Sequence, residues 1–104
     1  MFGLSVRFTC RDLESAEGFD KLVADTLPQI KQHEPGTLVY AVHSHSVEGK
    51  PLERIFYELY RDRAAFDAHE GQAHTRRMLA ERQEFLASVN VDFLALLDGK
   101  GTSG

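Results

Sequence analysis

Residues 37–60 read TLVYAVHSHSVEGKPLERIFYELY, and this stretch decides the fold. Side chains of different character alternate along residues 37–46 and again along residues 52–61. Alternation with a period of two is typical of β-strands, because successive side chains of a strand point to opposite faces. Between these segments lies the VEGKP sequence at 47–51, which favours a turn. The sequence therefore predicts two antiparallel strands joined as a hairpin.

The segment before this hairpin predicts a strand followed by a helix. Residues 2–10 alternate between apolar and polar side chains, and Asp12 is a suitable N-cap for the helical pattern of apolar residues that runs to Ile30. Pro28 lies inside that pattern and lacks a backbone N–H, so we expect a kink or an early end of the helix there. The EPG sequence at 34–36 then favours a turn.

The segment after the hairpin predicts a second helical region and a last strand. Asp62 is a suitable N-cap, Gly71 divides the region, and apolar residues continue at helical spacing from Met78 to Val89. The apolar run at 91–97 has the length of a strand. The order strand, helix, strand, strand, helix, strand predicts an α+β fold of the ferredoxin-like βαββαβ type, with a four-stranded antiparallel sheet.

Length and composition limit the classes of protein that fit. A chain of 104 residues predicts one domain, which we place at residues 1–98, followed by a flexible tail at 99–104. Twelve Lys and Arg against 16 Asp and Glu give a net charge of −4, which disfavours binding to nucleic acid or to anionic membranes. Cys10 is the only cysteine, so no intramolecular disulfide can form. With no targeting segment or long apolar run recognised, we expect a cytoplasmic protein.

The predicted third strand is apolar or aromatic on both faces. Phe56 and Tyr60 share one face, whereas Ile55, Tyr57 and Leu59 share the other. Helices cover only one face of a ferredoxin-like sheet, and an exposed apolar face normally needs a partner. We therefore expect a two-fold homodimer, with cover by loops as the alternative.

The histidines differ in what their positions favour. His43 and His45 share a strand face and could begin a metal site, but spacing places no third ligand near them, so we expect no metal. His69 and His74 both extend the apolar face of the second helical region. They are either buried histidines satisfied by backbone carbonyls or by Glu58, or a catalytic pair.

Glu58 lies between two aromatic residues of its strand face. A carboxylate in such surroundings must be paired or have a raised pKa, and Arg7 in the first strand is a candidate partner. The pair could be a structural ion pair or part of a catalytic site. An apolar pocket with polar groups could be lined by six residues, although such residues often belong to a core. These candidate substrate-binding residues are Arg7, Tyr40, Phe56, Tyr60, Phe66 and Met78.

Three motifs in this order resemble the antibiotic biosynthesis monooxygenase family. They are EPGTLVY at 34–40, FYELY at 56–60, and AFDAH at 65–69, the last followed by His74. The resemblance extends over nearly the whole chain, from residue 1 to about residue 97. It implies a ferredoxin-like subunit of a dimeric α/β barrel, with Glu58, His69 and His74 as the catalytic residues.

The resemblance also implies a function. Family members include oxygenases that act on polycyclic phenols or quinols without metal, flavin or haem, and relatives with this fold degrade haem or isomerise small metabolites. The chain has no Trp, and Tyr60 stands where many members have one, which disfavours haem degradation. We expect a small dimeric monooxygenase without a cofactor that combines a phenolic or quinol-type aromatic substrate with molecular oxygen. A non-oxidative isomerase and a ligand-binding or stress-related dimer are the alternatives.

A mechanism can be stated from ordinary pKa values. A neutral His, with a pKa of about 6.5, could accept the proton of a phenol whose pKa is about 10, a mismatch worth about 5 kcal/mol. Arg7 and the second histidine could stabilise the resulting anion, and Glu58 could orient an imidazole. Either His69 or His74 could be the base.

Overall fold

The computed structural model describes residues 1–101. The elements, in chain order, are β1 (Phe2–Cys10), α1 (Leu13–His33), β2 (Thr37–His45), the short 3₁₀ helix η1 (Ser46–Glu48), β3 (Lys50–Tyr60), α2 (Arg63–Glu70), α3 (Ala73–Glu81), a second 3₁₀ helix η2 (Arg82–Glu84) and β4 (Leu86–Ala95). This order confirms the predicted α+β, ferredoxin-like fold, with the second helical region divided into α2 and α3. The tail expected at 99–104 lies partly outside the described residues.

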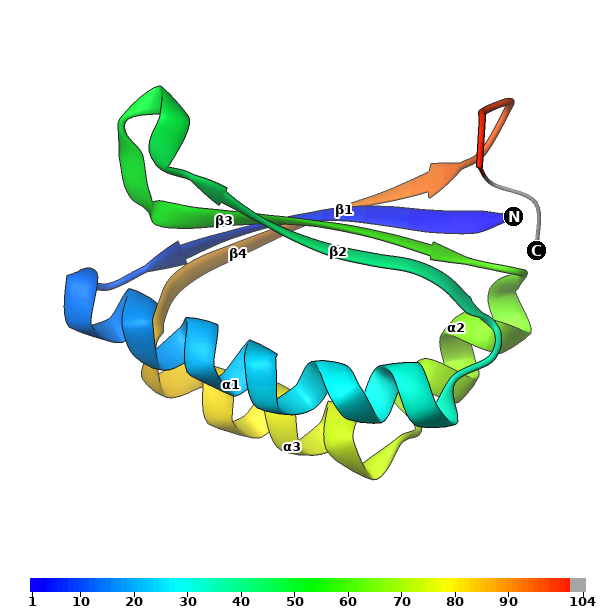
Figure 1. Cartoon of the computed structure of the whole chain (residues 1–104), viewed down its shortest axis with the longest axis horizontal. Coiled ribbons are helices and arrows are strands. Elements are labelled where there is room, and N and C mark those ends of the chain that lie inside the picture. Colours follow the sequence, from blue (N-terminus) through cyan, green and yellow to red (C-terminus); the bar gives the residue numbers. More distant parts are fainter. Residues whose placement is uncertain (102–104) are drawn as a thin grey trace.

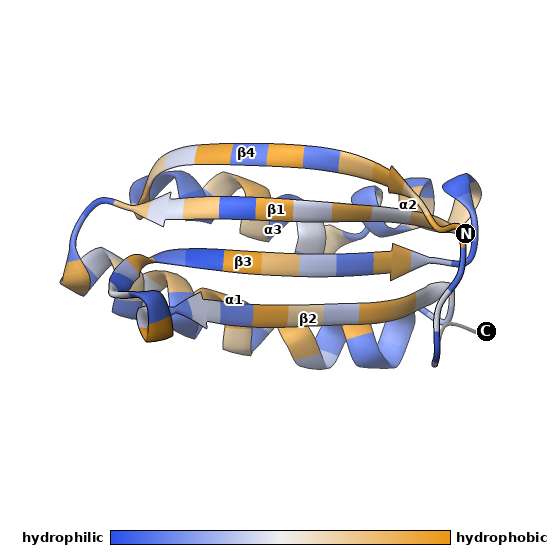
Figure 2. Cartoon of the chain, turned by 90° about the horizontal axis from the view of Figure 1, so that it is seen from above, coloured by the Kyte–Doolittle hydropathy of each residue, from blue (hydrophilic) through white to orange (hydrophobic). Residues whose placement is uncertain are grey.

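The four strands form one antiparallel sheet in the order β2-β3-β1-β4. All three α-helices lie on one face of this sheet (Figure 1). Seen from the other side, the strands have no helix in front of them (Figure 2). The predicted hairpin is confirmed, because β2 and β3 are adjacent and joined through η1.

Both predicted N-caps are confirmed. The Asp12 side chain accepts a 2.7 Å hydrogen bond from the backbone N–H of Ser15, and the Asp62 side chain accepts one of 2.8 Å from Ala65. Helix α1 continues past Pro28 to His33, so it does not end early. The buried face of α1 includes residues on both sides of Pro28, and this tertiary packing outweighs the loss of one backbone hydrogen bond.

The helical pattern predicted as far as Val89 is wrong from Leu86 on. Helix α3 ends at Glu81, one 3₁₀ turn follows, and β4 begins at Leu86 rather than at residue 91. Valine residues at alternate positions fit a strand as well as a helix, and the edge of β1 offers unpaired backbone groups that β4 satisfies. A register shift at the end of β1 places Leu86 opposite Cys10.

The helices pack differently against the sheet. Helix α1 contacts β1 and β3 directly, and aromatic rings fill the space between them. The ring centroids of Phe8 and Phe19 are 5.0 Å apart, and those of Phe8 and Phe56 are 4.6 Å apart. Helix α3 packs mainly against α1, which leaves room between α3 and the strands β1 and β4.

The outer face of the sheet confirms the expected two-sided pattern of β3. Ile55 and Tyr57 lie opposite Arg7 and Ser5 of β1, on the face away from the helices, and both are partly exposed. Leu59 is fully buried although it belongs to that same face. Among residues 1–101, no helix has both the length and the apolar character needed to cross a membrane.

Candidate active site

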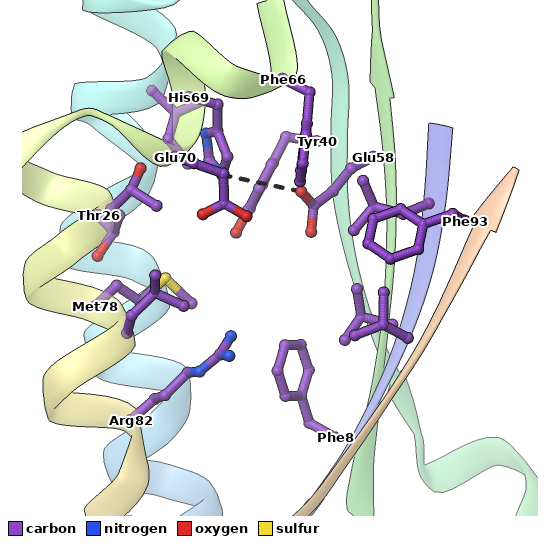
Figure 3. Close-up of a pocket in the computed structure, with 16 residues that line it drawn as sticks. Phe8, Thr26, Tyr40, Glu58, Phe66, His69, Glu70, Met78, Arg82 and Phe93 are labelled. Carbon is purple, nitrogen blue, oxygen red and sulfur yellow. Dashed lines mark ion pairs between the residues drawn. The ribbon is translucent and has the colours of Figure 1, made fainter. Parts of the chain in front are cut away.

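A cavity of about 120 Å³ lies where α3 stands away from the sheet (Figure 3). Its apolar wall comes from both layers and comprises Leu4, Val6, Phe8, Ile30, Phe66, Met78, Leu79, Val91 and Phe93. Val91 and Phe93 are 44% and 62% exposed, so the cavity opens beside the edge strand β4. Its polar groups come from Thr26, Tyr40, Glu58, His69, Glu70, Thr75 and Arg82.

Glu34 binds both His69 and His74 at one end of this site. Its Oε1 accepts hydrogen bonds from His69 Nδ1 at 2.6 Å and from Thr37 Oγ1 at 2.8 Å, and its Oε2 binds Nε2 of His74. The residue is the C-cap of α1 and is 7% exposed. The carboxylate therefore joins the end of α1 to the start of β2, to α2 and to α3.

A glycine lets α2 approach this carboxylate. A Cβ added to Gly36 would lie 2.7 Å from the Cβ of Ala65, which is far closer than carbon atoms pack. The short distance between the turn after α1 and the first turn of α2 thus requires the glycine. This approach brings His69, at the other end of α2, within reach of Glu34.

The charge of Glu34 is stabilised where it lies. Burial by itself raises the pKa of this carboxyl, but the hydrogen bonds from His69, His74 and Thr37 outweigh burial and hold the pKa below its ordinary value. Glu34 is therefore an anion at neutral pH. A carboxylate can only accept hydrogen bonds, so each histidine nitrogen that contacts it carries a proton.

This contact fixes the role of each nitrogen of His69. Nδ1 donates to Glu34, and in the neutral ring Nε2 is then an acceptor. Nε2 lies 3.9 Å from Glu58 Oε1, and the ring lines the cavity (Figure 3). His69 can therefore receive a proton from a molecule in the cavity, while Glu34 stabilises the imidazolium that forms.

Glu58 is buried, and a short hydrogen bond orients it. It is 6% exposed and accepts a 2.5 Å hydrogen bond from the Tyr60 hydroxyl. Burial raises the pKa of Glu58, and the opposing effects of the Tyr60 hydrogen bond and the charge of His69 do not cancel that effect. A neutral carboxyl is favoured here more than at a solvated site, and in that form Glu58 can donate a hydrogen bond.

The predicted pairing of Arg7 with Glu58 is wrong. Leu4 is the β1 residue opposite Glu58. Arg7 follows Leu4 by three positions, an odd number, so its side chain points to the other face of the sheet. There Arg7 Nη1 donates to Glu53 Oε1 at 3.0 Å. Arg7 does not line the cavity.

The other sequence-predicted residues divide into two groups. Tyr40, Phe66 and Met78 line the cavity, whereas Phe56 and Tyr60 are fully buried in the adjacent core. His74 does not line it either. It binds Glu34 beside the contact between α1 and α3, where its ring stacks near that of His33, with centroids 6.4 Å apart. The two histidines thus share a carboxylate, and only His69 faces the cavity.

Sequence reasoning missed several polar residues of the site, including Glu34, Thr75 and Arg82. Glu34 lies in the turn predicted at 34–36, and an acidic residue next to Pro-Gly, inside one of the family-like motifs, is a usable signal. Thr75 and Arg82 lie on the cavity side of the α3 region together with Met78, and their spacing of seven residues was the signal for a shared face.

The remaining histidines are occupied elsewhere. His43 Nδ1 lies 3.2 Å from the carbonyl oxygen of Ile55, and His45 Nδ1 lies 3.0 Å from Glu53 Oε1. Within the part of the chain that the structure describes, no three His, Cys, Asp or Glu side chains are grouped so that they could hold a metal ion.

Solved structures of low sequence identity share this fold. Rv0793 from Mycobacterium tuberculosis is 26% identical, with a TM-score of 0.82 over 94% of this chain and 96% of that one. PA3566 from Pseudomonas aeruginosa is 23% identical, with a TM-score of 0.81 over 93% and 94% of the two chains. A protein from Nitrosomonas europaea is 20% identical, with a TM-score of 0.84 over 94% and 100%.

The sequence comparisons agree with this similarity of fold. No curated protein matches the chain. The family model described as antibiotic biosynthesis monooxygenase matches residues 1–81, which include every element from β1 to α3 and all the polar groups of the cavity except Arg82. This chain belongs to the antibiotic biosynthesis monooxygenase family.

Proposed function

We propose that the protein is a homodimeric monooxygenase that oxidises a small phenolic or quinol-type substrate with molecular oxygen and without a cofactor. The observation that carries the proposal is the arrangement of His69, with Nδ1 held by the buried carboxylate of Glu34 and Nε2 facing the cavity. This is the arrangement of a general base whose positive form is stabilised in advance.

The first step is the removal of the phenolic proton. A histidine of pKa about 6.5 facing a phenol of pKa about 10 leaves a gap of about 5 kcal/mol. The anionic Glu34 stabilises the imidazolium that forms, and the hydroxyl of Tyr40 and the carboxyl of Glu58, which line the same cavity, stabilise the phenolate oxygen. His69 is the base in this scheme, and Glu34 is its positioning residue.

The second step uses the phenolate as the electron donor. One electron passes from the phenolate to molecular oxygen, and the two radicals combine to form a bond between a ring carbon and oxygen. Loss of water from the resulting hydroperoxide gives a quinone. The sum is phenol plus oxygen to quinone plus water, so the substrate supplies all four electrons and no external reductant is consumed.

The homodimer is supported by the outer face of the sheet. That face carries Ile55 and Tyr57 from β3 and Leu94 from β4, and no helix covers it (Figure 2). A second copy packed on this face would remove these apolar side chains from water. Sedimentation velocity is expected to give twice the mass of the chain, and replacing Tyr57 by Arg is expected to give the monomer.

The activity is tested by oxygen uptake. Substituted phenols and hydroquinones, each with one ring, are supplied to the protein in an oxygen electrode, and quinone formation is followed by absorbance. We expect uptake and quinone in a ratio of one to one, above the rate of autoxidation. A folded protein that consumes no oxygen with any of them contradicts the proposal. Turnover that continues without oxygen would instead support a non-oxidative enzyme.

A further inference from the structure

The guanidinium of Arg82 lines the cavity without an acceptor from residues 1–101. This group lines the wall opposite the strands (Figure 3) and is only partly exposed. Among residues 1–101, no side chain or carbonyl forms a hydrogen bond or an ion pair with it, and its guanidinium carbon lies over the ring of Phe8, 5.3 Å from the centroid. A guanidinium has five N–H donors, and leaving them without acceptors away from water is costly.

A second polar group of the same helical face is also without a partner. Thr75 is 5% exposed and lines the cavity, and its Oγ1 is buried without a hydrogen bond. Native proteins leave few such atoms unsatisfied. At a rise of 1.5 Å per residue, the backbone positions of Thr75 and Arg82 are separated by about 10 Å along the helical segment. The apolar side chains of Met78 and Leu79 lie between them.

The cavity therefore has two polar ends and an apolar middle. His69, Tyr40 and Glu58 lie together at one end, and Arg82 lies at the other, beside Phe8 (Figure 3). Tyr40, Glu70 and Glu58 act on the pKa of Arg82 through their charges and raise it, and neither glutamate forms an ion pair with it. Burial lowers the pKa of Arg82 more than these acids raise it, which is the effect expected of a cation that lacks a close anion.

We propose that Arg82 is the subsite for the carboxylate of an aromatic acid, whose hydroxyl is directed to His69 at the opposite end of the cavity. The assignment of the hydroxyl rests on the function proposed above, whereas the carboxylate subsite does not. A carboxylate matches the planar donors of a guanidinium and can bind them through two parallel hydrogen bonds. The apolar middle accommodates the ring.

The volume favours a molecule with one ring. An apolar protein cavity of about 150 Å³ is known to bind benzene, and the cavity here is about 120 Å³ before any side chain moves. A system of three or four rings is much larger than this space, which opens beside the partly exposed Val91 and Phe93. The inferred ligand class is therefore a hydroxylated benzoate, which differs from the polycyclic substrates that the family resemblance implied.

The test compares an acid with its uncharged ester. The probes are 2,5-dihydroxybenzoate and its methyl ester, and binding is measured without oxygen by isothermal titration calorimetry. For the native protein we expect the acid to bind about 10 to 100 times more tightly than the ester, the range of a charge-assisted hydrogen bond in a partly buried site. In R82Q the preference is expected to fall to about one.

Two further variants make the result specific. Arg76 lies in α3, the helix directly before Arg82, but is exposed and does not line the cavity, so R76Q is the matched control and is expected to keep the full preference. R82K keeps the charge without the planar fork and is expected to keep part of the preference. It also provides the test if R82Q does not fold, in which case equal preference in R82K and the native protein would overturn the proposal.

Other results of the binding measurements would overturn the carboxylate subsite. Equal affinity for acid and ester in the native protein, binding of neither, or an undiminished preference in R82Q would each overturn the subsite. Oxygen uptake measured with the same two probes separates this proposal from the proposed function. An Arg82-dependent preference, with no oxygen uptake from these probes or from the phenols and hydroquinones named above, supports the subsite and contradicts the oxygenase. Uptake together with equal affinities for acid and ester supports the oxygenase and overturns the subsite.

Discussion

Two arginines, the buried Arg54 and the partly buried Arg82, lie on the same side of the sheet in different surroundings. Arg54 of β3 lies beside the aromatic core under α1, where both oxygens of Asp20 bind its guanidinium at 2.7 and 3.0 Å. Its Nη1 donates to two backbone carbonyls, those of Pro51 and Glu53. Arg82 lies under the α3 side, next to a cavity, and has a ring face instead of an acceptor.

The difference follows from how the two long helical segments pack. Helix α1 lies directly on the sheet, so its side chains fill the volume below it and pair with the polar groups there. Helix α3 lies mainly against α1, so its inner face looks onto a space that the chain does not fill. Arg54 is therefore held by partners within the fold, whereas the donors of Arg82 face a space that the chain leaves open and stay available to a bound molecule.

The largest expected effect concerns His69, the proposed general base in the cavity beside α3. Replacing His69 by Gln removes the group that accepts the proton, and turnover is expected to fall by about 10²- to 10⁴-fold. His33 is exposed, so H33Q is the matched control and is expected to change turnover by less than about twofold. Initial rates of oxygen uptake measure both. A variant H69Q with more than a tenth of the native rate would exclude His69 as the base.

The next effect concerns Glu34, whose carboxylate binds Nδ1 of His69. E34Q keeps the shape of the side chain but removes its charge, and turnover is expected to fall by about 10- to 100-fold, the usual effect of losing a partner of a reactive histidine. E17Q, at an exposed position of α1, is the control.

The pH dependence of stability gives a second readout for Glu34. The pKa of this group is lower in the folded state, so its contribution is present above the unfolded pKa and is lost as pH falls through the folded pKa. Native stability should decline in acid more steeply than that of E34Q. Equal acid slopes would contradict the network described around Glu34.

The two arginines themselves give a matched pair of stability measurements. R54M leaves Asp20 and two carbonyls without their donor, and the free energy of unfolding is expected to fall by about 1–3 kcal/mol. R82M leaves no protein group unpaired, and the change is expected to stay within about 0.5 kcal/mol or to be stabilising. Urea unfolding measures both. A loss in R82M as large as that in R54M would remove the contrast.

The smallest expected effect is the pH dependence that Glu58 contributes. The pKa of this group is raised in the folded state, so its contribution is present below the unfolded pKa and is lost as pH rises through the folded pKa. One such group changes stability by at most about 1.4 kcal/mol per pH unit within that window. E58Q should lack this slope while keeping an acceptor for Tyr60. Parallel pH profiles for the two proteins would argue against a raised pKa.

Much of the fold could be predicted because its signals are local. Alternation placed the strand at 2–10 and the hairpin, and Asp12 and Asp62 marked the two helix starts. Prediction failed from Leu86 on, where the residues fit helix and strand equally and pairing with β1 decided between them. Arg7 was misplaced although its position along the strand, relative to Leu4, already assigned it to the outer face.

The sequence by itself determined the elements from β1 to α2, and that Glu58 and His69 face the interior, because these properties follow from backbone geometry over a few residues. Only the tertiary structure decided where β4 begins, that Glu34 meets His69 across 35 positions of the chain, and that Arg82 is left with no acceptor among residues 1–101. Both facts depend on the distance at which α3 and α2 pack against α1 and the sheet. That distance is set by the packing of the whole domain, which no short segment encodes.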